Sequence, residues 1–426
     1  MRSSATHSRT SRIRPGMAVL VAAVTAVGLL SGPGGDAGAA GDFYTPPSKF
    51  DDDPGSVIRT QAQSLLLQIP GIGNQWPGDA KRIMYTSTRQ NGDPVAVTGT
   101  VVEPTAKWRG EGERPTVVIG SGTVGQGDQC ASSRMLSFPL SIDPHKLSLG
   151  VNYTGLEMYP LLLNGVRVVT TDYIGMGTPG VHTYLNRLES GRAMLDAARA
   201  GLSVADAPPD APVGFSGYSQ GGGAAASAAE LASAYAPGLN IKGTYAGAPP
   251  ADLSKLISKI DGTLIAGANA YVINGIAAGY PSAASVLKRQ FNRRGRQASK
   301  DASTQCIPDT LAAFGFQNTR EWTRSGTSLA AVVRDTPVLE KIVDDQRIGR
   351  MKPNAPVLIS IANNDDVVPA GQVVQLYRDW RAKGADVTLT RDYAPPILPG
   401  MVINHGWPML GKLPSAISFM LGQFNR

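Results

Sequence analysis

Cysteine and histidine are scarce in this sequence. Its 426 residues include two cysteines and four histidines. A structural zinc site usually takes four such ligands. A cysteine-rich metal site is therefore excluded, and we expect no bound metal.

Excess charge of one sign is also small. The formal net charge is +7, but residues 1–40 hold four arginines and one aspartate, so the rest of the chain carries only +4. Nothing in the sequence is typical of a zinc finger, a basic zipper or an RNA-binding sheet, and we expect no nucleic-acid partner. With 42% hydrophobic and 17% charged residues, the chain can bury a full core.

Long hydrophobic runs are absent after the first 40 residues. Near the start, arginines precede an apolar run of 14 residues from Met17 to Leu30, and small residues then lead into Gly41. This order is typical of a cleavable secretory signal, and the run is short for a bilayer span. We expect residues 1–40 to be removed, leaving a mature chain without a transmembrane segment that is secreted, extracellular or in the cell envelope. A retained N-terminal anchor is the alternative.

The expected export of the chain bears on the oxidation state of its two cysteines. In an oxidising space, Cys130 and Cys306 would pair with each other and close a long loop. In the chain-entropy model such a crosslink stabilises a protein by up to ~5 kcal/mol. Two free buried thiols are the alternative.

The apolar pattern alternates between short strands and helices. Two early strands, 82–87 and 95–102, flank Asn91-Gly92-Asp93 and predict a hairpin. Continuously apolar runs follow, with helices between several of them, which indicates an α/β fold whose mostly parallel sheet is covered on both faces. The hairpin is expected at one edge. The later strands are expected at 116–119, 166–170, 213–215, 241–245, 356–361 and 387–391, and the helices at 190–200, 221–235, 372–383 and 414–424.

The alternation breaks between residues 253 and 354, where helix-like segments replace a single crossover. We expect these residues to form a helical cap or lid above the carboxyl ends of the strands, where open α/β sheets bind their ligands. The core would then consist of residues 41–252 and 355–426.

The strongest motif is Gly217-Tyr218-Ser219-Gln220-Gly221. It follows the strand 213–215 and opens an Ala-rich helix, which is the strand, turn and helix context of a nucleophile elbow. The flanking glycines suit a tight turn with close backbone contacts. We therefore predict that Ser219 is a nucleophile; the alternative is a plain Gly-rich turn.

A serine nucleophile needs a base and a carboxylate that orients the base. In this architecture both should follow the serine, the acid first. His405 is the only histidine after Ser219, because His7, His145 and His182 precede it. We predict that His405 is the base and lies between the last strand and the terminal helix; a surface or packed histidine is the alternative.

The acid is expected in the loop after strand 356–361, where Asp365 and Asp366 are adjacent. Neighbouring side chains point in different directions, so at most one can face the histidine. We favour Asp365, because it lies nearer the end of the strand. A calcium site is the alternative for this Asn/Asp cluster, although it lacks the ligand spacing of an EF-hand loop.

An oxyanion needs preorganised N–H donors. We predict the backbone of Gln220 as one donor and Thr123, in the loop after strand 116–119, as the other. That loop, Gly120 to Gly125, also matches G-x-G-x-x-G, but no helix is predicted where a dinucleotide pyrophosphate would need one. We therefore expect no cofactor.

Taken together, these motifs resemble the secretory lipase family, the lipase A type of α/β-hydrolase. The resemblance covers essentially the whole mature chain and rests on Phe43 to Pro47, Gly217 to Gly221, the Gly-Thr loop with Asp128 to Ser133, Thr171 to Gly180, and Asp365 to Pro369. It implies a capped α/β-hydrolase that cleaves carboxylic esters, with Ser219, Asp365 and His405 as the triad and a disulfide between Cys130 and Cys306. Many members carry His-Gly-Thr in the oxyanion loop, where this chain has Ser121 before Gly122-Thr123.

The sequence thus indicates a secreted serine lipase or esterase that acts on lipid-like acyl esters through an acyl-enzyme. An acyltransferase with the same triad and a catalytically silent lipid-binding envelope protein are the alternatives. Basic residues in the cap suggest contact with anionic lipid head groups, or else they form a solvated helix face. They are Lys288, Arg289, Arg293, Arg294, Arg296 and Lys300.

Overall fold

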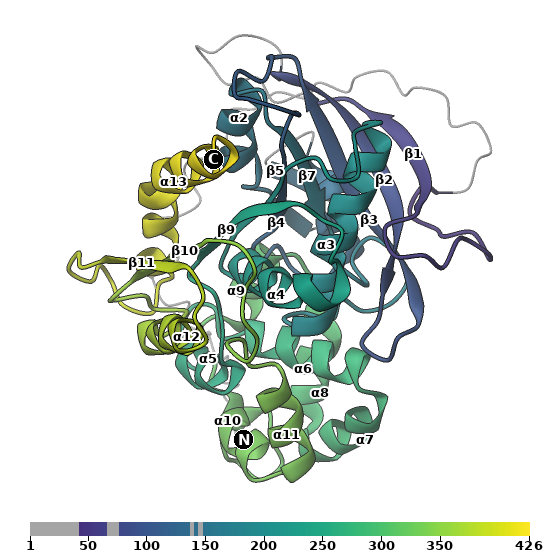
Figure 1. Ribbon diagram of the computed structural model, residues 1–426. Coiled ribbons are helices and arrows are strands. Elements are labelled where there is room, and N and C mark those ends of the chain that lie inside the picture. The colour runs from purple at the N-terminus through teal and green to yellow at the C-terminus, as the bar shows by residue number, and fades with distance from the viewer. Residues whose placement is uncertain (1–41, 66–75, 137–139, 144–147) are drawn as a thin grey trace, which may run out of the picture. The chain divides into compact units, whose positions relative to one another are not determined.

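A nine-stranded sheet dominates the part of the chain that the computed structural model describes, which is residues 42–65, 76–136, 140–143 and 148–426 (Figure 1). Its strand order is β1-β2-β3-β7-β4-β8-β9-β10-β11. The strands are β1 (Val57–Gln63), β2 (Gly78–Thr88), β3 (Pro94–Pro104), β4 (Thr116–Gly120), β7 (Arg167–Thr171), β8 (Val213–Tyr218), β9 (Ile241–Gly247), β10 (Val357–Ala362) and β11 (Val387–Asp392). The predicted signal segment, residues 1–40, lies outside the described residues.

The sheet is mostly parallel, as the sequence predicts. Strands β7, β4, β8, β9, β10 and β11 run parallel to one another, and β2 and β3 form the predicted antiparallel hairpin, of which β3 pairs antiparallel with β7. The hairpin is not the outermost element, because β1 pairs with β2 beyond it. β1 is half-buried or exposed along most of its length, as is usual for an edge strand, and this weak apolar signal explains why the sequence did not predict it.

Helices cover both faces of the sheet (Figure 1). α3 (Arg187–Val204) and α4 (Gln220–Tyr235) pack together on one face, and α2 (Gly155–Leu163) and α13 (Ile403–Phe424) pack on the other. α12 (Ala370–Ala382) contacts β10 and β11. None of the described helices combines the length and the apolar character needed to cross a bilayer.

A group of short helices occupies the chain between β9 and β10 and lies together beyond one end of the sheet (Figure 1). We call them the inserted helices: α5 (Leu253–Ile260), α6 (Ala268–Gly279), α7 (Pro281–Gln290), α8 (Arg293–Ala302), α9 (Ile307–Phe314), η2 (Thr319–Glu321), α10 (Leu329–Arg334) and α11 (Pro337–Asp345). They share a hydrophobic core with α12 and with β10, and residues 43–426 form one compact unit. A functional division at residues 253 and 354 stays a prediction.

The terminal helix begins earlier than predicted, at Ile403 instead of Pro414. Proline is usually confined to the first helical turn, yet both Pro408 and Pro414 lie inside this helix. Packing of Ala416, Ile417, Met420 and Phe424 against the sheet stabilises the helix despite these prolines. His405 therefore lies in the first turn of a helix and not in a loop.

Short elements that the sequence did not predict lie between β4 and β7. They are η1 (Asp128–Cys130), α1 (Ser132–Met135), α2, and the two-stranded ribbon of β5 (Leu140–Asp143) and β6 (Ser148–Val151). Their apolar periodicity is weak at such lengths. They follow the glycine-rich loop after β4.

Candidate active site

Ser219 lies at a sharp turn between β8 and α4. Its backbone dihedral angles are φ 59° and ψ −122°, a region that a non-glycine residue rarely adopts and that is often found at functional sites. The turn is fixed on both sides, because the Ser219 N–H donates to the Gly247 carbonyl at 2.9 Å and the Gly223 N–H donates to the Ser219 carbonyl at 2.9 Å.

Two glycines of the motif leave room for this turn. A Cβ atom on Gly217 would lie 2.4 Å from the backbone carbon of Gly221, and one on Gly221 would lie 1.9 Å from the carbonyl oxygen of Gly120. Both distances are too short for a side chain. The glycines therefore allow the start of α4 to approach the ends of β8 and β4 closely.

His405 is paired with a carboxylate. Its Nδ1 lies 2.8 Å from Oδ2 of Asp365, which follows β10. The other oxygen of Asp365, Oδ1, accepts hydrogen bonds from the N–H groups of Val367 and Val368 at 2.9 and 2.7 Å. Three donors thus fix this buried carboxylate, and the pairing sets the orientation of the imidazole.

Asp366 points elsewhere. Its Oδ2 accepts from the Gly400 N–H at 3.1 Å and from Nδ2 of Asn404 at 3.2 Å. The two adjacent carboxylates therefore have different partners: Asp365 holds the histidine, and Asp366 holds the loop that leads to it.

A cavity of about 300 Å³ brings the predicted residues together. Ser219, Gln220, Thr123 and His405 all line it. The phenol of Tyr218 also contacts the histidine, because its hydroxyl donates to the His405 carbonyl at 2.9 Å. The remaining wall is largely apolar and includes Leu256, Ile260, Ile265, Ala268, Ile307 and Leu311 from the inserted segment.

The loop after β4 forms one side of this cavity. No helix opens in it before η1, so its G-x-G-x-x-G pattern lacks the helix N-terminus that holds a pyrophosphate. The Tyr173 hydroxyl donates to the Ser121 carbonyl at 2.9 Å, and Thr123 Oγ1 lies 2.7 Å from the Tyr184 hydroxyl. The loop is thus held by tyrosines that follow β7.

His182 is a residue whose place the sequence did not reveal. It is fully buried and stacks on Tyr173. Its Nδ1 lies 3.1 Å from the Ile174 carbonyl, and its Nε2 lies 2.8 Å from Nε2 of Gln220. Nδ1 therefore donates to the carbonyl, and Nε2 accepts from the amide. Burial lowers the pKa of His182 to about 4, so the imidazole is neutral at pH 7. His145 lies outside the described residues.

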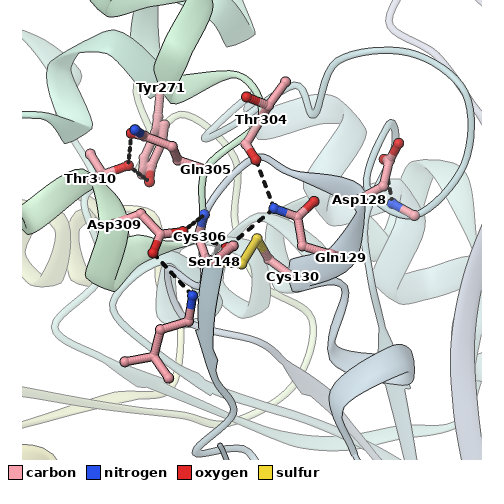
Figure 2. Close-up of a disulfide and its surroundings, with 12 residues drawn as sticks. Asp128, Gln129, Cys130, Ser148, Tyr271, Thr304, Gln305, Cys306, Asp309 and Thr310 are labelled. Carbon is pink, nitrogen blue, oxygen red and sulfur yellow. Dashed lines mark hydrogen bonds between the residues drawn. A yellow bond between two sulfur atoms is a disulfide. The ribbon is translucent and has the colours of Figure 1, made fainter. Parts of the chain in front are cut away.

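The predicted disulfide is present between Cys130 and Cys306, with an S–S distance of 2.05 Å (Figure 2). It crosslinks the segment after the glycine-rich loop to the start of α9. Further contacts join the same two regions: Gln129 Nε2 donates to the Thr304 carbonyl at 2.7 Å, and the Ser148 hydroxyl donates to Asp309 at 2.5 Å (Figure 2). The inserted helices are thus attached to the cavity wall covalently.

The described residues contain no cluster of three or more His, Cys, Asp or Glu side chains arranged to hold a metal ion. In the Asn/Asp segment after β10, Asp365 and Asp366 use their oxygens for the histidine and for backbone and amide donors.

Comparison with known proteins gives a consistent result. Residues 144–426 match the model of a family described as secretory lipase. A probable inactive lipase of Mycobacterium tuberculosis is 31% identical over 82% of this chain and 76% of its own length. A secreted triacylglycerol lipase of Malassezia restricta is 25% identical over 89% of this chain and 78% of its own.

Solved structures agree on the fold. The structure of Candida antarctica lipase A superposes with a TM-score of 0.76 and 23% identity, covering 90% of this chain and 85% of that one. A mutant of the rice cell wall degrading esterase from Xanthomonas oryzae superposes with a TM-score of 0.71 and 16% identity, covering 87% and 100%. The fold is that of an α/β-hydrolase.

Proposed function

We propose that this chain, which belongs to the secretory lipase family and is secreted, hydrolyses lipid-like carboxylic esters through an acyl-enzyme on Ser219. The family and its lipase relatives support a lipase or esterase. The observation that carries the finer proposal is the Asp365–His405 pair, whose histidine lines the same cavity as the serine at the turn before α4.

The acid and base have complementary roles. A proton on Nδ1 of His405 is held by Asp365, so Nε2 is left as the acceptor that removes the proton of the Ser219 hydroxyl. The serine oxygen then attacks the ester carbonyl, and the imidazolium returns its proton to the departing alcohol. Water attacks the acyl-enzyme with the same base, releasing the carboxylic acid and the free serine.

The negative charge on the carbonyl oxygen needs N–H donors. Gln220 begins α4, and the first N–H groups of a helix have no partner within the helix. Its backbone N–H therefore suits one donor position. Thr123 also lines the cavity and would supply the second donor, with its hydroxyl hydrogen-bonded to Tyr184.

The apolar wall of the cavity suits an acyl chain. Leucine and isoleucine side chains from the inserted segment line the same cavity as the serine, and burying apolar chain carbons there is favourable. The inserted segment would thus supply the acyl site, and the turns after β8 and β10 together with the first turn of α13 would supply the chemistry.

The basic cluster of the inserted helices is a second part of the proposal. Lys288 and Arg289 from α7 and Arg296 from α8 line an open cleft together with Arg324, which follows η2. Such a cleft would attract anionic lipid head groups, and its binding would weaken as salt rises. Loss of binding to anionic vesicles in Lys288→Ala/Arg289→Ala protein is the expected result.

Hydrolysis of a chain-length series of p-nitrophenyl esters by wild type and Ser219→Ala tests the proposal. The variant is expected to lose at least about 10³-fold in rate. Ser227→Ala is the control, because this serine lies on the same helix and donates to the Gly223 carbonyl outside the cavity. An unchanged rate in Ser219→Ala would show that Ser219 is not the nucleophile. Formation of an ester of an added alcohol, in place of free acid, would indicate an acyltransferase.

A catalytically silent lipid-binding protein is a second candidate, because one relative is named a probable inactive lipase. The complete set of Ser219, His405 and Asp365 argues against it. Retained lipid binding with no turnover of any ester in the series would favour it.

A further inference from the structure

One tyrosine hydroxyl in the wall of the catalytic cavity has no hydrogen-bond partner within the described part of the chain. The hydroxyl-bearing side chains that line the cavity, besides Ser219, are Thr123, Tyr153, Tyr184 and Tyr218. Thr123 and Tyr184 pair with each other at 2.7 Å, and Tyr218 donates to the His405 carbonyl at 2.9 Å. The hydroxyl of Tyr153 forms no such bond with any described residue. It is therefore available to donate to a molecule bound in the cavity.

The Tyr153 hydroxyl lies beside the glycine-rich loop after β4. A Cβ atom on Gly122 would lie 1.9 Å from the Tyr153 hydroxyl oxygen, so a larger residue at this position would displace the hydroxyl. Gly122 directly precedes Thr123, whose N–H we propose as the second donor to the oxyanion. The hydroxyl thus lies against the backbone of the loop that would stabilise the developing negative charge.

Packing fixes the position of the Tyr153 ring. The half-buried ring packs against a hydrophobic cluster that contains Val124 and the disulfide. The preceding residue is also anchored, because Asn152 Nδ2 donates to the Ser132 carbonyl at 3.2 Å. A donor held in this way needs little rearrangement when charge develops on a substrate, which is the property that makes an oxyanion donor effective.

The other side chains of the loop do not offer an equivalent donor. Ser121, which stands where many members of the family carry histidine, does not line the cavity. Its hydroxyl lies 2.7 Å from that of Ser132. The hydroxyl of Thr123 is paired with Tyr184. A side-chain donor to a substrate carbonyl would therefore have to come from another segment, and Tyr153 lies between β6 and α2.

The Tyr153 hydroxyl keeps its proton at neutral pH. Burial, with a smaller contribution from Tyr184, raises the pKa of Tyr153 above its usual value. A phenol that retains its proton is a hydrogen-bond donor and not a competing negative charge. Tyrosine is one of the side chains suited to stabilise an oxyanion.

We propose that the Tyr153 hydroxyl is a third oxyanion donor, which donates a hydrogen bond to the carbonyl oxygen of the ester as that oxygen becomes negative. It would act together with the N–H groups of Gln220 and Thr123. The phenol keeps its proton throughout, so the proton transfers between Ser219, His405 and the departing alcohol are unchanged. This inference rests on the proposed function for its reaction and assigns a further catalytic residue to it.

Tyr153→Phe removes the hydroxyl and keeps the ring that packs on the hydrophobic cluster. We expect kcat for a soluble p-nitrophenyl ester to fall by about 10²-fold while KM stays within about threefold, because the lost bond forms only as charge develops. Tyr159→Phe is the matched control, since Tyr159 is also half-buried but packs on Trp76 and does not line the cavity. Its rate should stay within about twofold of wild type.

A tetrahedral inhibitor distinguishes this role from a structural one. A trifluoromethyl ketone forms an adduct with the serine whose oxygen carries a negative charge, so its affinity should fall in Tyr153→Phe by the same factor as kcat/KM. The p-nitrophenyl and ethyl esters of one acid should also lose kcat/KM by equal factors, because the same oxyanion forms from both.

Three results would overturn the proposal: unchanged kcat and inhibitor affinity in Tyr153→Phe, an equal loss in Tyr159→Phe, or a much larger loss on the ethyl ester. The last result would place the hydroxyl at the departing oxygen instead. If Ser219→Ala is inactive and Tyr153→Phe is unaffected, only this inference fails. Full activity in Ser219→Ala would instead overturn the proposed function.

Discussion

Oδ2 of Asp365 lies 2.8 Å from Nδ1 of His405, although 40 residues separate them in the sequence. The carboxylate comes from the loop after β10, and the imidazole comes from the first turn of α13. The pairing joins the end of the sheet to the terminal helix. It also makes Asp365 and Asp366 chemically distinct, which gives a direct comparison between two adjacent residues.

Replacing Asp365 by Asn should lower kcat/KM by up to about 10⁴-fold, as expected when an amide stabilises the wrong tautomer of the base. Asp366→Asn should cost less than about tenfold, because an amide oxygen can still accept from Gly400 and Asn404. Steady-state hydrolysis of a soluble ester measures both. A larger loss in Asp366→Asn than in Asp365→Asn would show that the assignment of Asp365 as the acid is wrong.

His182 should act as a positioning residue for Gln220. His182→Leu removes the acceptor for the Gln220 side-chain amide, so the backbone N–H of the same residue would be held less firmly near the oxyanion. We expect kcat to fall about tenfold while KM stays within about twofold, the pattern of an interaction made in the transition state. His182→Gln, which restores an acceptor, should recover most of the rate. Equal kinetics for the two variants would argue for a purely structural role.

Two ionisable groups, the half-buried Glu157 and the buried His182, should give the stability opposite dependences on pH. Burial raises the pKa of Glu157 from 4.5 to about 7, while a hydrogen bond from Ser216 lowers it. Since the folded state holds the proton more tightly, this contribution to stability is present below pH 4.5 and is lost as pH rises through 7. For His182, with a pKa lowered from 6.5 to about 4, stability is lost as pH falls from 6.5 through 4.

Urea unfolding between pH 4 and 8 (about the range of both transitions) checks these signs. Glu157→Gln should flatten the loss of stability on the alkaline side, and Glu340→Gln, at an exposed site on α11, should leave the curve unchanged. A Glu157→Gln curve parallel to that of wild type throughout would contradict the assignment.

The disulfide should stabilise the attachment of the inserted helices. It closes a loop across a sequence separation of 176 residues, so Cys130→Ala/Cys306→Ala should lower the unfolding free energy by about 2–5 kcal/mol. Thermal unfolding of the variant and of the wild type with and without reductant measures this. A melting temperature that neither treatment changes would show that the noncovalent contacts suffice.

Local patterns predicted much of the fold. The buried parallel strands are continuously apolar, and the hairpin is marked by Asn91-Gly92-Asp93, so these elements follow from nearby residues. The edge strand β1 and the start of α13 were not predicted. β1 is held in the sheet by its pairing with β2. α13 is stabilised by its packing on the sheet, despite the prolines that it contains. Both depend on distant contacts.

The candidate site also combines residues that the local sequence predicts with residues that it does not. The flanking glycines predict Ser219, and the order of residues along the chain predicts His405. The directions of Asp365 and Asp366 depend on α13, which adjacent residues do not encode. His182 gave no signal, because its partners Gln220 and Ile174 come from separate segments.

Covalent labelling by an organophosphonate p-nitrophenyl ester, followed by mass spectrometry of the digested protein, tests the central claim most directly. The account predicts release of one p-nitrophenolate per labelled chain, loss of activity, and a phosphonyl adduct on Ser219, with no adduct in Ser219→Ala protein. An adduct at another residue would contradict it. So would a Ser219→Ala protein that keeps its hydrolytic rate and then loses it completely on treatment with the reagent.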